Sequence, residues 1–445
     1  MLLKDRRIAI VSVIVIAFGL RLGGKVLFSE ESTFWVSAYR EYYNIAHSLN
    51  NGQGFCVLTN NNALEHAGID QAILGGGCAH LPPGYPVILS LVASLDHDYE
   101  KCFQFDHRCR SDYLSIVLAQ SLMSTGTVLC AFLLGTHLFG TSTGLLASVI
   151  AAVYPYYIWH DTSLQETGVF TFFTALSVLL LYKAASSRQK ILWISAGIAF
   201  GGTVLIRVSL LPFVGLVIFW LGGLHFGSTL RERIGLVLMF AVTFIIVLSP
   251  WLARNYLVLG SPVLTTQTGR FLWVGNNANT FSYYPTEYID LSEAEAWQAL
   301  AASELERISA RSTDEIAQSR WFFRRGLDFM ADNPRLTLLR VLKKLWAGFS
   351  WNFSPAKDTL VQRVYFLSYL PILLLGGAGM WLTRIRWREL GLIYLLFLAF
   401  GVSTAVFWAH TSHRTYLDLY LMVFAAHMLR VVYRKRLLGI GKNLR

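Results

Sequence analysis

Apolar residues in this chain are concentrated in long runs separated by short polar gaps. Ten of these runs are close to the roughly 20 residues that an α-helix needs to cross a bilayer. They cover residues 7–28, 113–138, 142–158, 165–183, 191–206, 208–225, 234–253, 363–383, 390–408 and 415–431. The pattern predicts an all-α, multi-pass membrane bundle with about ten spans.

Composition supports this class of protein. Of the 445 residues, 54% are hydrophobic and only 15% are charged. These proportions exclude a soluble enzyme, a small secreted disulfide module and a disordered chain.

The charges are distributed unevenly along the chain. The whole chain carries +11, yet the N-terminus, alternate gaps between the apolar runs and the C-terminal tail hold 17 basic residues against three acidic ones. The basic residues are Lys4, Arg6, Arg7, Lys183, Arg188, Lys190, Arg231, Arg233, Arg384, Arg386, Arg388, Arg430, Arg434, Lys435, Arg436, Lys442 and Arg445. By the positive-inside rule, these segments and both termini are cytoplasmic. Nucleic acid is not an expected partner.

The same topology places two long loops outside, at residues 29–112 and 254–362. Residues 84–95 are apolar but short, and counting them as a span would put the basic clusters outside, so we expect an interfacial or re-entrant helix there. The predicted divisions are a first span at 1–28, a first outer loop at 29–112, a transmembrane bundle at 113–253, a second outer loop at 254–362, and C-terminal spans with a basic tail at 363–445.

Four of the five cysteines lie in the first outer loop, which suits disulfides in an oxidising compartment. We expect Cys102 to pair locally with Cys109, and Cys56 with Cys78, although the sequence alone permits three pairings. A zinc site is less favoured, because the loop contains no CxxC motif.

The second outer loop shows helical periodicity. Residues 292–330 predict an amphipathic helix with Ser292 as N-cap and Glu295 completing a capping box. The sequence Asp332-Asn333-Pro334 ends this pattern, and residues 335–350 predict a basic helix that lies on the membrane surface or packs on the loop domain.

Chemistry is most plausible where ionisable side chains approach the apolar zone, because a charge there is costly and is usually kept for a task. By the predicted topology, all but the last of these residues lie towards the outer ends of spans. They are Arg21, Asp161, Glu166, Arg207, Arg254, Arg414 and Asp418. Snorkelling to the interface is the simpler explanation for any one of them.

Several motifs along the chain resemble one family. They are Tyr42 to Ala46 with Gly52 to Phe55, Pro82 to Pro86, Tyr154-Pro155 with Gln165 to Thr167, Arg207, Pro250 to Tyr256, Gly260 to Val263, Gly275 to Asn277, Asn333-Pro334, and His413 to Tyr416. In order and spacing they are similar to those of bacterial glycosyltransferases related to protein O-mannosyltransferases and to the aminoarabinose transferase of lipid A, which have the GT-C fold.

The resemblance implies transfer of a sugar from a polyprenyl phosphate to a lipid, glycan or protein acceptor, with inversion, at the periplasmic face of the bacterial inner membrane. Arg254 and Arg414 are the candidates for binding the donor phosphate, because guanidinium groups stabilise a leaving group that gains negative charge. Candidate substrate-binding residues are Tyr42, Asn276, Asn277 and Tyr416, although Gly-Asn-Asn is also a good turn sequence.

One departure from the family concerns the catalytic base. Counting back from Ala46 places Ala38 where the family has an Asp. Glu41, Glu166 and Asp161 are the remaining candidate catalytic carboxylates. No cofactor is expected, and a divalent cation is left open. The alternatives to a transferase are a transporter or flippase of a lipid-linked saccharide, and a catalytically inactive homologue.

Overall fold

Helices form most of the described residues in each of the ten predicted apolar runs. The computed structural model describes residues 2–28, 30–36, 40–58, 62–187, 189–223, 229–282, 289–352, 358–408 and 411–440. The bundle helices are α1 (Leu2–Phe28), α7 (Arg110–Phe139), α8 (Thr141–Val153), α9 (Pro155–Asp161), α10 (Thr167–Ser187), α11 (Lys190–Ile206), α12 (Leu211–Gly223), α13 (Leu230–Leu259), α19 (Thr359–Leu382), α20 (Trp387–Val406) and α21 (Thr411–Ile440). The fold class predicted from the sequence is confirmed.

Seven of these helices are long and apolar enough to cross a membrane, namely α1, α7, α10, α13, α19, α20 and α21. The helices α8, α11 and α12 are shorter. One predicted run, 142–158, is divided in the structure, because α8 ends before Tyr154 and Pro155 begins α9. The count of ten spans therefore stays a prediction.

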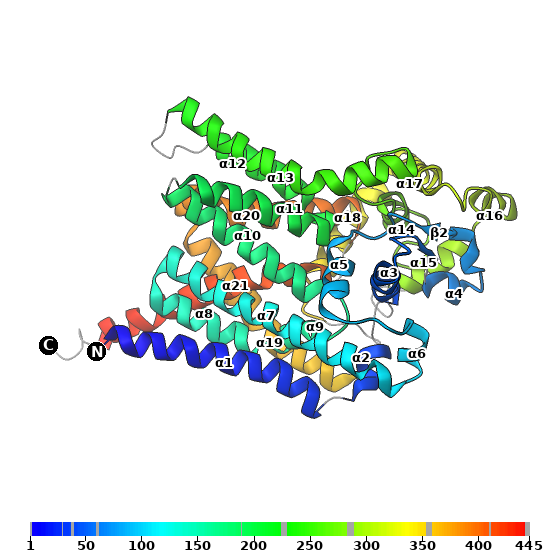
Figure 1. The fold of residues 1–445 in the computed structure, drawn as a ribbon. Coiled ribbons are helices and arrows are strands. Elements are labelled where there is room, and N and C mark those ends of the chain that lie inside the picture. Colours follow the sequence, from blue (N-terminus) through cyan, green and yellow to red (C-terminus); the bar gives the residue numbers. More distant parts are fainter. Residues whose placement is uncertain are drawn as a thin grey trace.

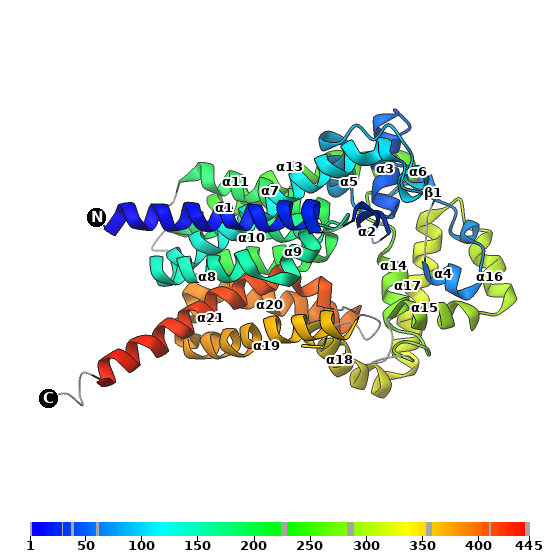
Figure 2. The same ribbon diagram turned by 90° about the horizontal axis from the view of Figure 1, so that it is seen from below.

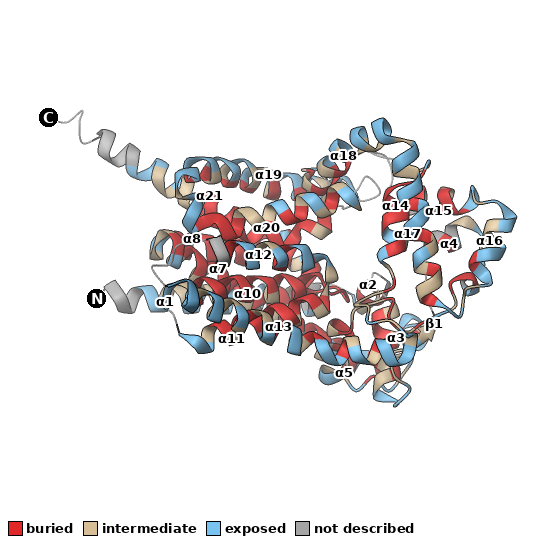
Figure 3. Ribbon diagram, turned by 90° about the horizontal axis from the view of Figure 1, so that it is seen from above, coloured by how far each residue is buried: buried red, intermediate tan, exposed pale blue. Residues whose placement is uncertain are grey.

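The outer helices of the bundle carry apolar side chains on their surface. On α13, Leu238, Val242 and Ile246 follow one another at intervals of four and are all more than half exposed. Figure 3 shows this division, with buried residues inside the bundle and exposed ones along α1 and α13. Such a surface is stable against lipid. Exposing it to water would cost about 25 cal/mol of free energy for each Å² of apolar area.

Small residues allow neighbouring helices to approach closely. A Cβ atom on Gly197 of α11 would lie 2.6 Å from the carbonyl oxygen of Phe240 in α13. On α19, a Cβ atom on Gly379 would lie 2.4 Å from the carbonyl oxygen of Phe424 in α21. This close packing of small residues is typical of helices in membranes.

The two outer loops form one end of the molecule. The first loop contains α2 (Glu31–Val36), α3 (Arg40–Asn50), β1 (Val57–Leu58), α4 (Asn62–Ala67), β2 (Gly76–Gly77), α5 (Gly84–Val92) and α6 (Tyr99–Phe103), and β1 pairs with β2 antiparallel. The second contains α14 (Thr268–Gly275), α15 (Ile289–Gln298), α16 (Ala302–Ser309), α17 (Glu315–Asp332) and α18 (Pro334–Phe349). The start of α1 and the end of α21 lie at the opposite end of the bundle (Figures 1 and 2).

Two corrections concern the second loop. Residues 292–330 form three helices, α15 to α17, instead of one. Ser292 lies inside α15 and is buried, so it is not an N-cap; Asp314 caps α17 instead by accepting a hydrogen bond from the amide of Ala317. The predicted break is confirmed, because α17 ends at Asp332 and α18 begins at Pro334.

Helix α18 has two different faces. Lys344, Ala347 and Gly348 are buried, and α18 packs on α20. Leu338 and Leu342 are 71% and 68% exposed on another face. An exposed apolar stripe on a basic helix fits the membrane-surface interpretation, although the structure contains no membrane.

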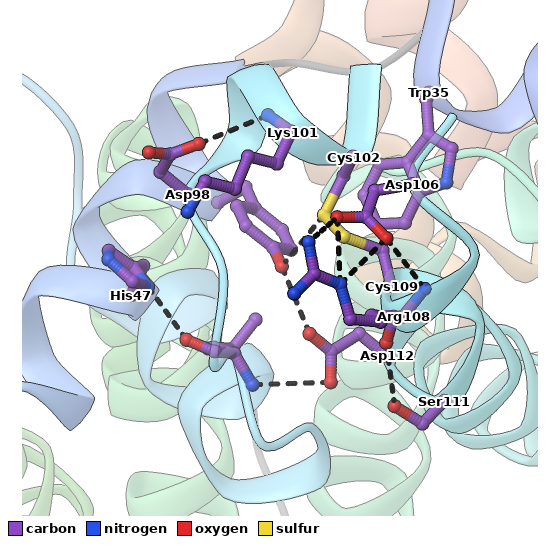
Figure 4. The surroundings of a disulfide bond; sticks show 12 residues. Trp35, His47, Asp98, Lys101, Cys102, Asp106, Arg108, Cys109, Ser111 and Asp112 are labelled. Carbon is purple, nitrogen blue, oxygen red and sulfur yellow. Dashed lines mark hydrogen bonds and ion pairs between the residues drawn. A yellow bond between two sulfur atoms is a disulfide. The ribbon is translucent and has the colours of Figure 1, made fainter. Parts of the chain in front are cut away.

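Both expected disulfides are present, Cys56–Cys78 and Cys102–Cys109. Figure 4 shows the second one beside Asp112, at the start of α7. The Asp112 carboxylate accepts hydrogen bonds from the backbone amides of Ser94 and Leu95 and from the hydroxyl of Tyr43. The disulfide and this carboxylate therefore fasten the first loop to the bundle.

Accessibility labelling tests the predicted orientation. Ser187, at the end of α10, and Ser303, on α16, are both exposed, and the predicted topology places them on opposite sides of the membrane. A cysteine placed at Ser303 should react with a membrane-impermeant maleimide in intact cells, and one at Ser187 should react only after permeabilisation. The reverse pattern would contradict the predicted topology.

Candidate active site

Arg21 of α1 and Asp161 at the end of α9 form an ion pair inside the bundle. The Arg21 Nε lies 3.0 Å from Oδ2 of Asp161, and the two side chains are 0% and 4% exposed. The hydroxyl of Ser124 donates a hydrogen bond to the same carboxylate, and the other guanidinium nitrogens donate to backbone carbonyls of α1 and α8. Asp161, a predicted catalytic residue, is thus enclosed in a set of contacts that joins four helices, α1, α7, α8 and α9.

Arg414 and Asp418, one turn apart on α21, form a second internal pair. The Arg414 Nε lies 2.9 Å from Oδ1 of Asp418, and both side chains are 0% exposed. The guanidinium also donates to the carbonyls of Gly348 and Ser350 and to the hydroxyl of Tyr365. Arg414 is therefore enclosed by protein groups in this structure, and its role in binding the donor phosphate stays a prediction.

Glu166 and Arg207 form a third pair, which is more accessible than the other two. Their side chains are 10% and 16% exposed. Glu166 directly precedes α10 and Arg207 directly follows α11; the Arg207 Nε lies 3.1 Å from Oε1 of Glu166. The guanidinium lies 5.0 Å above the ring of Phe170, against which Tyr416 packs edge to face at 5.1 Å.

The first outer loop borders this pair through Tyr85 of α5. Burial, and then the nearby carboxylate of Glu166, raise the pKa of the Tyr85 phenol well above its usual value. Its hydroxyl donates a 2.5 Å hydrogen bond to Gln120 of α7, and its ring packs edge to face with Tyr42 of α3 at 5.0 Å. Gly84, which begins α5, lies so close to the backbone of Ile206 that a Cβ atom there would be 2.8 Å from its nitrogen. Helix α5 of the first loop therefore lies beside the end of α11 and the residue that precedes α10.

Glu41, also on α3, pairs with His80, which lies in the stretch before α5. Oε2 of Glu41 is 3.3 Å from Nε2 of His80, and the side chains are 15% and 6% exposed. Burial lowers the pKa of His80, but the carboxylates of Glu41 and Glu315 outweigh burial and the opposing charge of Arg270, so its pKa is raised. The sequence alone does not predict this pair, because no spacing rule connects residues 41 and 80.

Glu315, at the start of α17, holds the segment that carries His80. Its carboxylate accepts hydrogen bonds from the backbone amides of Cys78 and Ala79 and from the hydroxyl of Thr266. This buried carboxylate thereby links the two outer loops.

Arg254 lies inside α13, which continues to Leu259, and it contacts the first loop. Its Nη1 donates a 2.6 Å hydrogen bond to the carbonyl of Cys78, and its guanidinium lies 5.0 Å and 5.5 Å above the rings of Trp251 and Phe55. None of these partners is shared with Arg414 in the described part of the chain. The two arginines predicted to share one phosphate thus belong to separate networks.

Asn276 and Asn277 form a buried turn after α14. The Asn276 amide donates to the carbonyls of Leu272 and Val406, and the Asn277 amide donates to those of Trp273 and Val274. These bonds support the turn interpretation of Gly-Asn-Asn instead of a direct role in sugar binding.

Lys344 of α18 completes the same turn. Its ammonium donates to Oδ1 of Asn276 and to two carbonyls, of Ala405 and Val406, at the end of α20. Burial, followed by the charge of Arg340, lowers the pKa of Lys344 to about 8. The negative end of the α20 dipole compensates for the buried cation, and the periodicity of α18 did not predict that this lysine is buried.

Two further points concern the site. The described residues contain no group of three or more His, Cys, Asp or Glu side chains that could hold a metal ion. Ala38, where the family has its Asp, lies outside the described residues.

Residues 109–253 match the protein-family model described as dolichyl-phosphate-mannose-protein mannosyltransferase. This segment includes both members of the Glu166–Arg207 pair. No curated protein matches the chain.

Two solved structures are similar in fold. The first is the archaeal oligosaccharyltransferase AglB from Archaeoglobus fulgidus in complex with an inhibitory peptide and a dolichol-phosphate; it shares 14% identity, with a TM-score of 0.55, over 99% of this chain and 52% of its own. The second is the Archaeoglobus fulgidus oligosaccharyltransferase in complex with Zn and sulfate, with 14% identity and a TM-score of 0.53 over 98% of this chain and 50% of its own. The chain spans about half the length of these structures. It has a GT-C-like oligosaccharyltransferase fold.

The raised pKa of His80 makes a prediction about pH. A raised folded-state pKa means that the stabilisation is fully present below the ordinary value of about 6.5 and is lost as pH rises through the higher folded-state value. Between pH 6 and 9, the free energy of unfolding by which the wild type exceeds His80→Gln should decrease by about 1 to 2 kcal/mol. Melting curves of the two proteins in detergent measure this difference; a difference that does not change with pH would show that His80 is not the titrating group.

Proposed function

We propose that this protein is a membrane glycosyltransferase that moves a sugar from a polyprenyl phosphate to an acceptor hydroxyl, with inversion, at the periplasmic face of a bacterial inner membrane. The observation that carries the proposal is the Glu166–Arg207 pair. It lies at the loop-bearing end of an apolar bundle, within the segment similar to mannosyltransferases, and it is the most accessible of the three pairs.

Arg207 has the chemistry that the leaving group requires. As the bond between the anomeric carbon and the phosphate oxygen breaks, negative charge grows on the polyprenyl phosphate. A planar guanidinium at the apolar boundary stabilises that charge more strongly in the transition state than in the ground state. Glu166 holds Arg207 in place before the donor binds. Arg254 is the second candidate for the phosphate, since it is only half-buried and also lies at the loop-bearing end.

Glu41 is our candidate for the proton acceptor, with His80 as its partner. The acceptor oxygen attacks the anomeric carbon while its proton passes to the Glu41 carboxylate, and the sugar–phosphate bond breaks. Glu41 directly precedes Tyr42, whose ring packs on Tyr85 next to Glu166. Helix α3 therefore lies beside the proposed donor site, and in this proposal Glu41 supplies the function of the Asp that Ala38 replaces.

A transfer assay tests this proposal. Purified protein in detergent should convert polyprenyl-phosphate sugars to free polyprenyl phosphate and a glycosylated acceptor. Arg207→Ala should reduce the rate by about 30-fold to 1000-fold, which corresponds to about 2 to 4 kcal/mol of lost transition-state stabilisation. Arg207→Lys should restore the rate only in part, because lysine lacks the planar fork.

Glu41→Gln separates the roles of the carboxylates. A large loss of turnover with unchanged donor binding, in a variant that remains folded in detergent, identifies Glu41 as the base, whereas near-normal turnover excludes it. Arg335→Ala, which removes an exposed arginine from α18, is the matched control and should transfer sugar at the normal rate. Saccharide transport without free polyprenyl phosphate would favour a flippase, and neither activity would favour an inactive homologue.

A further inference from the structure

The surface of α17 that faces α16 carries a concentration of positive charge outside the proposed donor site. A hollow of about 410 Å³ opens there. Its charged and aromatic lining consists of Arg311, Arg320, Arg324, Arg325, Trp321 and Asp328. Four arginines against one carboxylate make this an electropositive hollow.

Most of this charge is not neutralised by the protein. Arg325 pairs with Glu304 of α16 at 2.6 Å, but Arg311, Arg320 and Arg324 form no ion pair within the part of the chain that the structure describes. Arg311 and Arg320 donate only to backbone carbonyls of their own neighbourhood. Arg320 and Arg324 are one turn apart on an exposed helix face, where like charges destabilise a helix. A bound anion would remove this repulsion.

A second hollow, of about 440 Å³, shares Arg320 and continues towards the bundle. Gly260, at the end of α13, and Thr265 and Thr266 also line it. Thr265 donates a hydrogen bond to the carbonyl of His80, and Thr266 donates to Glu315. Thr265 therefore connects the wall of this hollow to the backbone of His80.

The geometry points to one class of ligand. Guanidinium forks match phosphate and carboxylate groups. Trp321, which is half-buried with the guanidinium of Arg325 over its ring, adds an aromatic side chain to the lining of the hollow. Most of the residues that line the hollow lie on α17, and α16 and α17 lie at the end of the molecule opposite the start of α1 (Figures 1 and 2). We propose that the two hollows form a binding track for a saccharide that carries phosphate or carboxylate groups. That this saccharide is the acceptor rests on the transferase function proposed above; its binding does not.

Binding can be measured without any transfer. Full-length protein in phosphatidylcholine nanodiscs should bind a fluorescent decagalacturonate in an anisotropy titration, and should not bind neutral maltodecaose. Arg320→Gln with Arg324→Gln should weaken decagalacturonate binding at least tenfold. The control Arg335→Gln with Lys343→Gln removes the same charge from exposed positions of α18 and should leave binding unchanged.

Several outcomes would overturn the proposal. They are equal binding of the neutral oligosaccharide, an equal loss in the control pair, and binding of an acidic decapeptide in place of the saccharide. Arginine-dependent binding to phosphatidylglycerol vesicles without saccharide binding would assign the surface to the membrane. A protein that binds decagalacturonate through Arg320 and Arg324 but releases no polyprenyl phosphate would support the binding track and refute the transferase. The failure of one proposal can thus be distinguished from the failure of the other.

A competition experiment identifies the natural form of the ligand. Phosphorylated oligosaccharide is added as competitor, either free or linked to a lipid, and the form that displaces decagalacturonate more strongly is the preferred one.

Discussion

A charge inside an apolar helical bundle must be neutralised by groups that the bundle itself supplies, and this constraint organises the whole molecule. Arg21 with Asp161 joins α1 to α9, and Arg414 with Asp418 joins α21 to the segment after α18. Breaking one partner of a buried pair leaves an uncompensated charge, which typically costs about 3 to 5 kcal/mol. Glu166 and Arg207 also neutralise each other, but their side chains are partly exposed. A charged pair at the edge of an apolar bundle that a ligand can reach is suited to bind a charged ligand.

The outer loops depend on polar fastening as well as on their small apolar core around Trp273 and Trp297. Two disulfides close the first loop, and Asp112 anchors it to α7. Glu315 then connects it to the second loop. These contacts hold α3 and α5 against the outer ends of α10 and α11, so the stability of the loops and the geometry of the site rest on the same few side chains.

Much of the fold could be predicted from the sequence, because hydropathy runs and loop charges report directly on helix length and exposure. The disulfides could be predicted because four of the five cysteines lie in the first outer loop. Glu166 and Arg207 could be selected because ionisable residues are rare near apolar runs. Pairing between distant residues could not: Glu41 with His80 depends on how α3 meets the next stretch of loop. Arg414 with Asp418 differs, since a separation of four on one helix already indicates a contact. The three helices between 289 and 332 were predicted as one because their periodicity continues across two short breaks.

The central claim is that the donor phosphate binds at Arg207, and a cryo-EM structure of the protein with bound polyprenyl phosphate tests it most directly. The account predicts phosphate density in hydrogen-bond contact with the Arg207 guanidinium. It also predicts that α5 lies next to the phosphate and that the lipid chain extends from it between the bundle helices. Phosphate density elsewhere, with the Glu166–Arg207 pair unchanged and no contact to Arg207, would contradict the account.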